Sequence, residues 1–340
     1  MPHRFLVKDI AFQAGLSTAT VDRVLNGRAG VRGQTATRVA AAVRELERQE
    51  GNLARGGKTL VIDVVIEAPE RFSNEVRAAF EREAGAFYPS MFRMRFQSAE
   101  RMDHASFAAL LDRIRLRGSD GVVVKAPDVA EVRAAVARLT QAGIPVLTLV
   151  TDLPGSTRLA YAGMDNAAAG RTAAYLVNMA LGDRGGCVLV TQSSSRFRGE
   201  EERVTGFRSA LLERGNRVTM VEISEGFGRD EQTGTLASAA LAAHPHICAV
   251  YSVGGANRSV LKAFDAESRE CRVFIAHDLD SDNRALLAGK RISFVLHHDL
   301  RTDIRNVCQL LLERNRSQPP SKVSLLSGIG IYSPYNDGPV

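Results

Sequence analysis

Apolar side chains recur at helical spacing through the first fifty residues. Residues 7–14 carry four of them on the i, i+3, i+4, i+7 spacing, which is typical of an amphipathic helix. Gly15 then marks a tight turn, and Ser17 is a natural N-cap for a second short helix with its own apolar stripe. A third stripe runs through residues 34–50. This pattern predicts three small helices whose first two form a helix-turn-helix, with an ordinary helical hairpin as the alternative.

From Thr59 the pattern changes to short apolar runs that alternate with amphipathic helices. The expected strands form two series, 59–67, 94–98, 121–125 and 145–150, then 186–192, 218–224, 248–253, 272–278 and 292–298. Strands that are apolar on both faces and alternate with helices predict parallel sheets covered on both sides. Two series predict two similar lobes, and a small ligand is expected between them, outside the carboxyl ends of the strands.

Residues 51–59 separate these two regions and are rich in glycine, as expected of a linker. We therefore expect an all-α helix-turn-helix head over residues 1–50, a linker or hinge over 51–59, and a two-lobed body over 60–340. The body would bind the ligand and form the dimer. The expected fold class is α/β, with two parallel sheets in the body. The length of 340 residues agrees, because it exceeds one typical core.

The net charge of +6 is distributed unevenly along the chain. Residues 1–58 hold ten Lys or Arg side chains and five acids, which leaves +5, so the remaining 282 residues carry only +1. A basic N-terminal unit on a nearly neutral body is the electrostatic footprint of a nucleic-acid-binding head. The charge therefore favours the helix-turn-helix interpretation over the plain hairpin.

Composition indicates an ordinary globular protein, with 45% apolar and 24% charged residues. No apolar run is long enough to span a bilayer, and the first residues show no signal-peptide pattern. The four cysteines lack CxxC spacing, which favours reduced thiols over disulfides or zinc ligands. We expect a cytoplasmic protein with no membrane partner.

Motifs for catalysis or metal binding are missing from the sequence. Neither GxSxG nor HExxH occurs. The run His297-His298-Asp299 lacks an evident third ligand for a metal. We expect no catalytic residues, no metal and no cofactor, and therefore a protein that is not an enzyme.

Over its whole length the chain resembles the LacI/GalR family of bacterial transcription regulators. In the head, the resemblance rests on VKDIA (7–11), AGLS (14–17), TV (20–21) and RVLNG (23–27). In the body, which looks like the fold of periplasmic sugar-binding proteins, it rests on DGVVV (120–124), AGIPVLTL (142–149), MDNAAAGRTAA (164–174), RVTGF (203–207) and VFIAHD (273–278). The head motif is specific, and the weaker body motifs occur in the family's order.

The resemblance implies that the second helix of the head lies in the major groove of DNA. Thr18, Ala19 and Arg23 would then read base edges, while Lys8, Arg28 and Arg32 would contact phosphates. The remaining candidates for DNA contact are Ser17, Thr20, Asn26 and Arg55. Ordinary solvent-exposed side chains are the alternative for each.

In the body, the resemblance implies a pocket for a sugar or polyol. Arg203 matches the family's pocket arginine, whose five donors suit adjacent hydroxyls. Asp278 and Asp165 follow apolar strands, where capping of a helix is the alternative. The other candidates are Phe72, which is equally suited to the core, together with Asp152, Asn257 and His298.

Two departures from the family pattern concern DNA binding. Asp22 replaces a small hydroxyl residue in the second helix, and a carboxylate near phosphates weakens binding unless it is paired. In the linker, Gly56-Gly57 follows Ala54-Arg55, where the family carries a leucine that wedges into the minor groove. Two glycines also disfavour a helix by about 2 kcal/mol relative to alanine.

These features together predict a homodimeric, sequence-specific DNA-binding regulator, expected to act as a repressor. Its partners would be double-stranded operator DNA of pseudo-palindromic sequence and a small effector, a sugar or polyol, bound between the lobes. One alternative is a carbohydrate-binding protein of the periplasmic type with no DNA role. Another is an enzyme on the same scaffold, because fold alone does not determine function.

Overall fold

The computed structural model describes residues 5–28, 33–53, 58–213, 217–315 and 326–336. Three helices form the head: α1 (Val7–Ala14), α2 (Thr18–Leu25) and α3 (Gly33–Leu53). Ser17 caps α2 by accepting a hydrogen bond from the backbone N–H of Thr20, as expected. A small core built around Ile10, Val21 and Val39 holds the three helices together.

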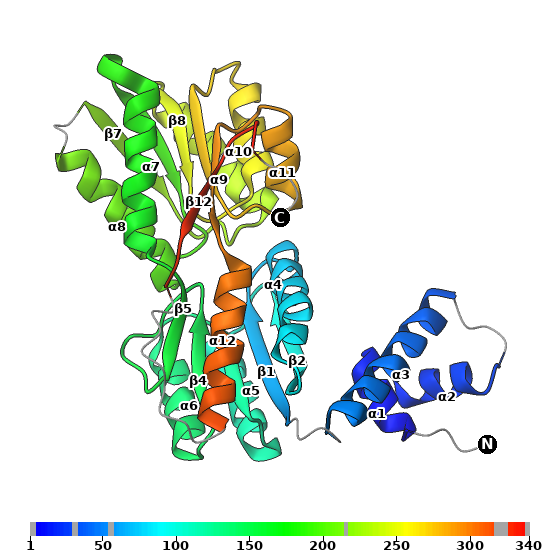
Figure 1. Cartoon of the computed structure of the whole chain (residues 1–340). Helices are drawn as coiled ribbons and strands as arrows, with labels where there is room; N and C mark the ends of the chain where they lie inside the picture. The colour runs from blue at the N-terminus through cyan, green and yellow to red at the C-terminus, as the bar shows by residue number, and fades with distance from the viewer. Residues whose placement is uncertain (1–4, 29–32, 54–57, 214–216, 316–325, 337–340) are drawn as a thin grey trace.

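Two six-stranded sheets form the body, and Figure 1 shows them in two lobes stacked one above the other. In the first lobe the strand order is β11-β5-β4-β3-β1-β2. Its elements are β1 (Thr59–Glu67), α4 (Glu70–Glu83), the 3-10 helix η1 (Ala84–Phe87), β2 (Met91–Ala99), α5 (His104–Arg117), β3 (Gly121–Lys125), α6 (Ala130–Gln141), β4 (Val146–Leu149), β5 (Ala160–Met164), α12 (Leu300–Asn315) and β11 (Leu326–Ser327).

In the second lobe the strand order is β12-β10-β9-β8-β6-β7, and among its described strands only the β10–β12 pair is antiparallel. Its elements are α7 (Asn166–Leu181), the 3-10 helix η2 (Gly182–Arg184), β6 (Gly186–Thr191), α8 (Arg198–Glu213), β7 (Val218–Ile223), α9 (Asp230–Ala243), β8 (Ile247–Ser252), α10 (Asn257–Ala266), β9 (Val273–His277), α11 (Ser281–Ala288), β10 (Phe294–His298) and β12 (Ile329–Tyr332). The expected two-lobed α/β fold is therefore confirmed.

The chain passes between the lobes three times. It crosses from β5 to α7, returns from β10 to α12, and crosses again from β11 to β12. Separate apolar clusters cover the two faces of each sheet, so each lobe has its own core. The three crossings in the described part of the chain therefore connect two independently packed lobes.

The observed elements differ from the expected ones only in short segments. The sequence did not predict strands β5, β11 and β12. They are short, and each is held mainly by pairing with a neighbouring strand of its sheet. Helix α3 continues to Leu53, into the segment 51–59 that was expected as a linker, whereas β1 begins at Thr59, as the expected strand 59–67 does. Among the described residues, no helix combines the length and apolar character needed to cross a bilayer.

Candidate functional site

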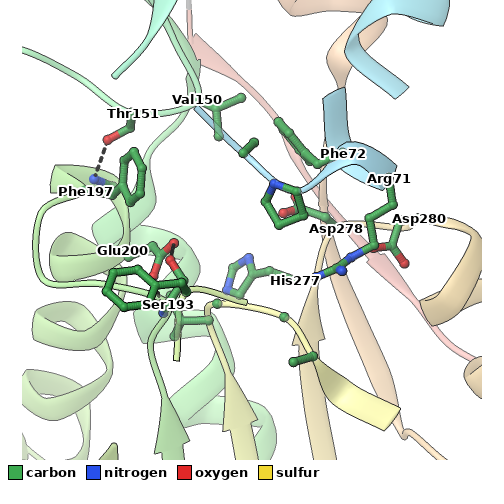
Figure 2. Close-up of a pocket in the computed structure, with 18 of the residues that line it drawn as sticks. Arg71, Phe72, Val150, Thr151, Ser193, Phe197, Glu200, His277, Asp278 and Asp280 are labelled. Carbon is green, nitrogen blue, oxygen red and sulfur yellow. Dashed lines mark hydrogen bonds and ion pairs between the residues drawn. The ribbon is translucent and has the colours of Figure 1, made fainter. Parts of the chain in front are cut away.

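A cavity of about 80 Å³ lies between the lobes, where the carboxyl ends of both sheets meet (Figure 2). Glu67 ends β1 and Lys125 ends β3 in the first lobe, while His277 ends β9 in the second. Such edges collect polar side chains at the point where a ligand reaches a parallel sheet. The cavity therefore lies where the strand pattern places a ligand.

Arg203 provides the central cation of this cavity and is only 3% exposed. Its Nε donates to Asn166 Oδ1 at 2.8 Å, and its Nη2 lies 2.8 Å from His298 Nε2. The guanidinium cannot accept a hydrogen bond, so the histidine nitrogen accepts. Arg203 reaches the cavity from α8, which packs closely against α7 because Gly170 has no side chain: a Cβ there would lie 1.9 Å from the Arg203 carbonyl oxygen.

Asp278 follows β9 with a left-handed backbone, φ 66°, which turns the chain at the edge of the cavity. Its Oδ1 is buried without a hydrogen-bond partner among the described residues and lies 3.4 Å from His298 Nε2. Burial raises the pKa of Asp278, although Arg203 and Lys125 act to lower it. Asp278 therefore brings an unsatisfied acceptor oxygen to the cavity lining.

Two buried histidines support this arrangement in their neutral form. Burial and the charge of Arg203 hold the pKa of both His277 and His298 well below the usual value. His277 Nε2 lies 2.8 Å from the Tyr251 hydroxyl, while its Nδ1 has no partner among the described residues. His277 therefore adds one more unsatisfied polar atom to the cavity lining.

Lys125 and Glu200 add two partly buried charged groups to the cavity wall. Lys125 Nζ donates to the Glu67 carbonyl at 3.0 Å and lies 4.2 Å from the centre of the Phe197 ring. Glu200 accepts from the backbone N–H of Ser193 at 2.7 Å and from its hydroxyl at 2.5 Å. Burial lowers the pKa of Lys125 and raises that of Glu200.

Contacts between the lobes close the cavity. Arg71 of α4 pairs with Asp280 of the second lobe at 2.9 Å, and Figure 2 shows both at one side. The backbone N–H of Gly199 donates to Thr151 Oγ1 at 3.0 Å across the opposite side. These contacts join residues from both lobes, so any opening of the cavity must break them.

Sequence reasoning missed several lining residues, among them Glu67, Lys125, His277 and Glu200. The first three are the last residues of their strands, so the rule that ligands bind at carboxyl ends of strands could have found them. Glu200 gave no such signal, because it lies inside the first turn of α8.

The sequence-based candidates divide into three groups in the structure. Phe72, Arg203, Asn257 and Asp278 line the cavity, and Phe72 also belongs to the core of the first lobe. Asn257 donates through Nδ2 to Asn283 Oδ1 at 2.6 Å, while its own Oδ1 is buried without a partner among the described residues. His298 stands behind the cavity wall, in contact with Arg203 and Asp278.

Asp152 and Asp165 lie outside the cavity lining, contrary to expectation. Asp152 accepts from Thr148 Oγ1 at 2.7 Å and pairs with Arg158, so its oxygens are satisfied within its own lobe. Asp165 is about half exposed and caps α7 by accepting from the backbone N–H of Ala168 at 2.8 Å. Both carboxylates satisfy local donors, which a sequence pattern does not distinguish from ligand contacts.

On the head, the candidate DNA contacts face solvent around α2. Thr18, Ala19 and Arg23 are exposed. Four further candidates are also exposed, Lys8, Ser17, Asn26 and Arg28, whereas Thr20 is partly buried and its hydroxyl bonds that of Ser17. Arg32 and Arg55 lie outside the described residues.

Asp22 is paired on the surface of α2. Its carboxylate accepts from Asn26 Nδ2 at 2.8 Å and lies 3.6 Å from Arg28 Nη2. Pairing offsets the repulsion that a free carboxylate would meet near phosphates. The departure from the family pattern at this position is therefore compensated within the head.

Comparison with known proteins separates the head from the body. The profile described as bacterial regulatory proteins, lacI family, matches residues 6–47, and the one described as periplasmic binding protein domain matches residues 64–311. The HTH-type transcriptional regulator TreR of Salmonella typhimurium is 30% identical over 132 residues, which cover 36% of this chain and 39% of TreR. The chain thus aligns with about two fifths of the length of this curated relative.

Solved structures resemble the body in fold. The glucose-galactose binding protein GanP of Geobacillus stearothermophilus is 19% identical with a TM-score of 0.74, over 82% of this chain and 99% of that chain. A solute binding protein of Burkholderia graminis, in complex with D-arabinose, is 18% identical with a TM-score of 0.74, over 82% of this chain and 97% of that chain. The periplasmic binding protein domain profile matches most of the chain, so the chain belongs to that family, and its N-terminal residues 6–47 match the profile of the lacI family of bacterial regulatory proteins.

Proposed function

We propose that this chain is a DNA-binding transcriptional regulator, acting as a repressor, whose affinity for operator DNA is set by a small sugar or polyol. The observation that carries the proposal is the presence, in one chain, of an exposed recognition helix and a polar cavity between two lobes. A free-standing sugar-binding protein has no use for the head.

For DNA, the proposal assigns α2 to the major groove. Thr18 and Ala19 begin this helix, Arg23 lies in its last turn, and all three are exposed and would contact base edges. Lys8 and Arg28 flank this surface and would bind phosphates. The other proposed contacts are Ser17, Thr20, Asn26, Arg32 and Arg55.

For the effector, the cavity combines an acceptor-only carboxylate with a donor-only guanidinium. Asp278 and Arg203 suit vicinal hydroxyls, because a hydroxyl both donates and accepts. Asn257 adds a free carbonyl oxygen, and Phe72 adds an apolar surface for a sugar ring. GanP and the arabinose-bound protein are named for sugars, which supports this class of ligand.

For assembly, we propose a homodimer that acts on DNA in the cytoplasm. One head covers only half of a two-fold operator, so two copies are needed to read a pseudo-palindromic site. The head, over residues 1–50, would be joined to the ligand-binding and dimerisation body by the short segment that follows it.

DNA selection followed by ligand titration tests the proposal. The full chain is used to enrich duplexes from a random library, and fluorescence anisotropy then measures affinity for the enriched sequence with and without monosaccharides and polyols. We expect enrichment of a two-fold sequence and a change of at least tenfold in affinity with one sugar. Failure to enrich any sequence would contradict the DNA role, and affinity unchanged by every sugar would contradict the effector class.

A further inference from the structure

A second hollow, which we call the hinge groove, lies at the crossings between the lobes. It measures about 680 Å³ and is lined by Glu75 and Arg82 of α4, Arg284 of α11, residues 297–302, Arg305, residues 328–330 and Tyr332. It shares no lining residue with the cavity described above. Figure 1 shows α12 running beside α4, with β12 continuing into the other lobe. Both lobes therefore contribute walls to this groove.

Arginines outnumber carboxylates in the hinge groove. Four guanidiniums border it, from Arg82, Arg284, Arg301 and Arg305. Two of them form ion pairs with the buried carboxylate of Glu83. Arg301 Nε lies 2.9 Å from Glu83 Oε1, and Arg305 Nη2 lies 2.7 Å from Glu83 Oε2. Both keep about half of their side chains exposed. Since each guanidinium has five donors, several N–H groups remain for a ligand in the groove.

Three carboxylates, those of Glu75, Glu83 and Asp299, oppose the four guanidiniums and leave one positive charge in excess. Asp299 accepts from the backbone N–H of Thr302 at 3.0 Å and from its hydroxyl at 2.6 Å, which commits both oxygens to the start of α12. Glu75 is the only other acid in the lining. The groove therefore offers convergent donors to an anion.

His298 adds a buried donor that lacks an acceptor. Because its Nε2 must accept from Arg203, the proton of the neutral ring lies on Nδ1. This Nδ1 is buried and has no partner among the described residues, and His298 is one of the residues that line the hinge groove, although its side chain is fully buried. A buried N–H without an acceptor is costly, so an oxygen supplied by a ligand would stabilise it.

We propose that the hinge groove binds the phosphate group of a small molecule. Guanidiniums recognise phosphate through paired, charge-assisted hydrogen bonds, and several of them converge here. The groove has room for more than the ion itself, which suits an organic phosphate. This site does not depend on the identity of the ligand between the lobes.

Binding at the hinge groove is coupled to the cavity between the lobes. His298 borders the groove and contacts Arg203 of the cavity, so both ligands act on the same side chain. The groove walls also come from both lobes, so a ligand there favours one arrangement of the lobes. Two sites that bias one arrangement influence each other's affinity reciprocally.

Calorimetry on the full chain tests this site, with inorganic phosphate and glycerol 3-phosphate as probes at constant ionic strength. Arg82→Gln should weaken binding at least tenfold, because it removes one exposed guanidinium of the groove. Arg113→Gln removes an exposed arginine of α5 and should leave the affinity unchanged. Thermal unfolding without ligand confirms that both variants are folded. Tighter binding of glycerol 3-phosphate assigns the site to a phosphate ester, and equal binding assigns it to the free ion.

Three outcomes would overturn the proposal. The first is the absence of binding by either probe. The second is equal affinity in the wild type and in Arg82→Gln, which would indicate nonspecific attraction to the basic head. The third is loss of binding in Lys125→Met with binding retained in Arg82→Gln, which would place the phosphate in the cavity between the lobes.

Discussion

Asp278 and Arg203 illustrate how single residues shape the cavity between the lobes. Each lies within hydrogen-bonding or ion-pair range of His298, and each keeps polar atoms directed at the cavity. Because these groups are buried, they lose more free energy when left unpaired than exposed groups would. A bound polyol would satisfy them, and this difference between the free and bound states is the source of affinity.

The first prediction concerns the carboxylate of Asp278. Asp278→Asn keeps the side-chain volume but replaces one acceptor oxygen with a donor amide, so the sugar that alters operator affinity should bind at least tenfold more weakly. This corresponds to about 1.4 kcal/mol. Calorimetry with that sugar measures the effect. Asp265→Asn, an exposed aspartate of α10, is the matched control and should bind normally. Normal binding by Asp278→Asn would place the sugar elsewhere.

The second prediction concerns Asp303, a fully buried aspartate of α12. Burial raises its pKa to about 7, which outweighs the nearby Ser327 hydroxyl, and Asp299 adds to the rise. An acid whose pKa is higher in the folded than in the unfolded state favours folding while protonated. Its contribution is present below about pH 4 and is lost as the pH rises to 7.

Asp303→Asn removes this pH-dependent loss of stability, because the asparagine side chain stays neutral at every pH. The free energy of unfolding of the variant, relative to the wild type, should therefore rise between pH 5 and pH 8. Urea denaturation at the two pH values measures the difference. The exposed control Asp265→Asn should differ from the wild type by the same free energy of unfolding at pH 5 and at pH 8. The same result for Asp303→Asn would show that Asp303 is ionised in the folded protein.

At the scale of elements, helices α7 and α8 approach each other through two glycines. A Cβ at Gly170 would lie 1.9 Å from the Arg203 carbonyl oxygen, and a Cβ at Gly206 would lie 2.2 Å from the Ala167 carbonyl oxygen. Only glycine permits this distance between the helix backbones. The close contact positions Arg203 at the cavity, so helix packing and ligand geometry are linked.

The third prediction tests this helix contact. Gly170→Ala must push α8 away, so we expect a loss of about 1–3 kcal/mol in the free energy of unfolding and weaker sugar binding. Gly155→Ala is the control, because its Cβ would lie 3.4 Å from Arg133 Cδ, an ordinary contact. Thermal or urea unfolding measures stability. Equal stability of the two variants would contradict the tight packing.

The fourth prediction concerns the linker, where Gly57 lies outside the described residues. Gly57→Leu supplies the apolar wedge that the family carries and removes a glycine that disfavours a helix. We therefore expect tighter operator binding, measured by fluorescence anisotropy on the enriched duplex. Unchanged or weaker binding would mean that this linker does not insert into the minor groove.

At the scale of the whole molecule, the head and the body have separate hydrophobic cores. The core of the head, around Ile10 and Val21, shares no member with the four apolar clusters of the body. Each unit therefore keeps its own hydrophobic core when the other is removed. The excess positive charge of the chain also lies almost entirely in the first 58 residues.

The fifth prediction uses this division. A fragment lacking residues 1–58 should still bind the sugar and should lose operator binding. Binding of the full chain should weaken steeply with salt, because phosphate contacts release counterions. Anisotropy across a salt series and calorimetry on the fragment measure both effects. Specific DNA binding by the fragment would contradict the assignment of the head.

Much of the fold followed from local patterns in the sequence. The cap at Ser17 and the apolar stripes of the head depend on neighbours within a few residues, and the structure has them as expected. The long apolar strands were also recognisable, because burial on both faces leaves a continuous apolar run. By contrast, β5, β11 and β12 are short, and their pairing with a sheet was visible only in three dimensions.

The sequence by itself determined that a basic helical head precedes a two-lobed α/β body, and it indicated Arg203 and Asp278 as pocket residues. The tertiary structure decided which polar side chains share a cavity. Asp152 and Asp278 both follow strands, yet Arg158 and Thr148 satisfy the first, whereas an oxygen of the second stays unpaired. The hinge groove also arises only where chain crossings bring distant arginines together. Strand and helix periods depend on neighbouring residues, but the partner of a charge depends on contacts between distant segments, which no local pattern encodes.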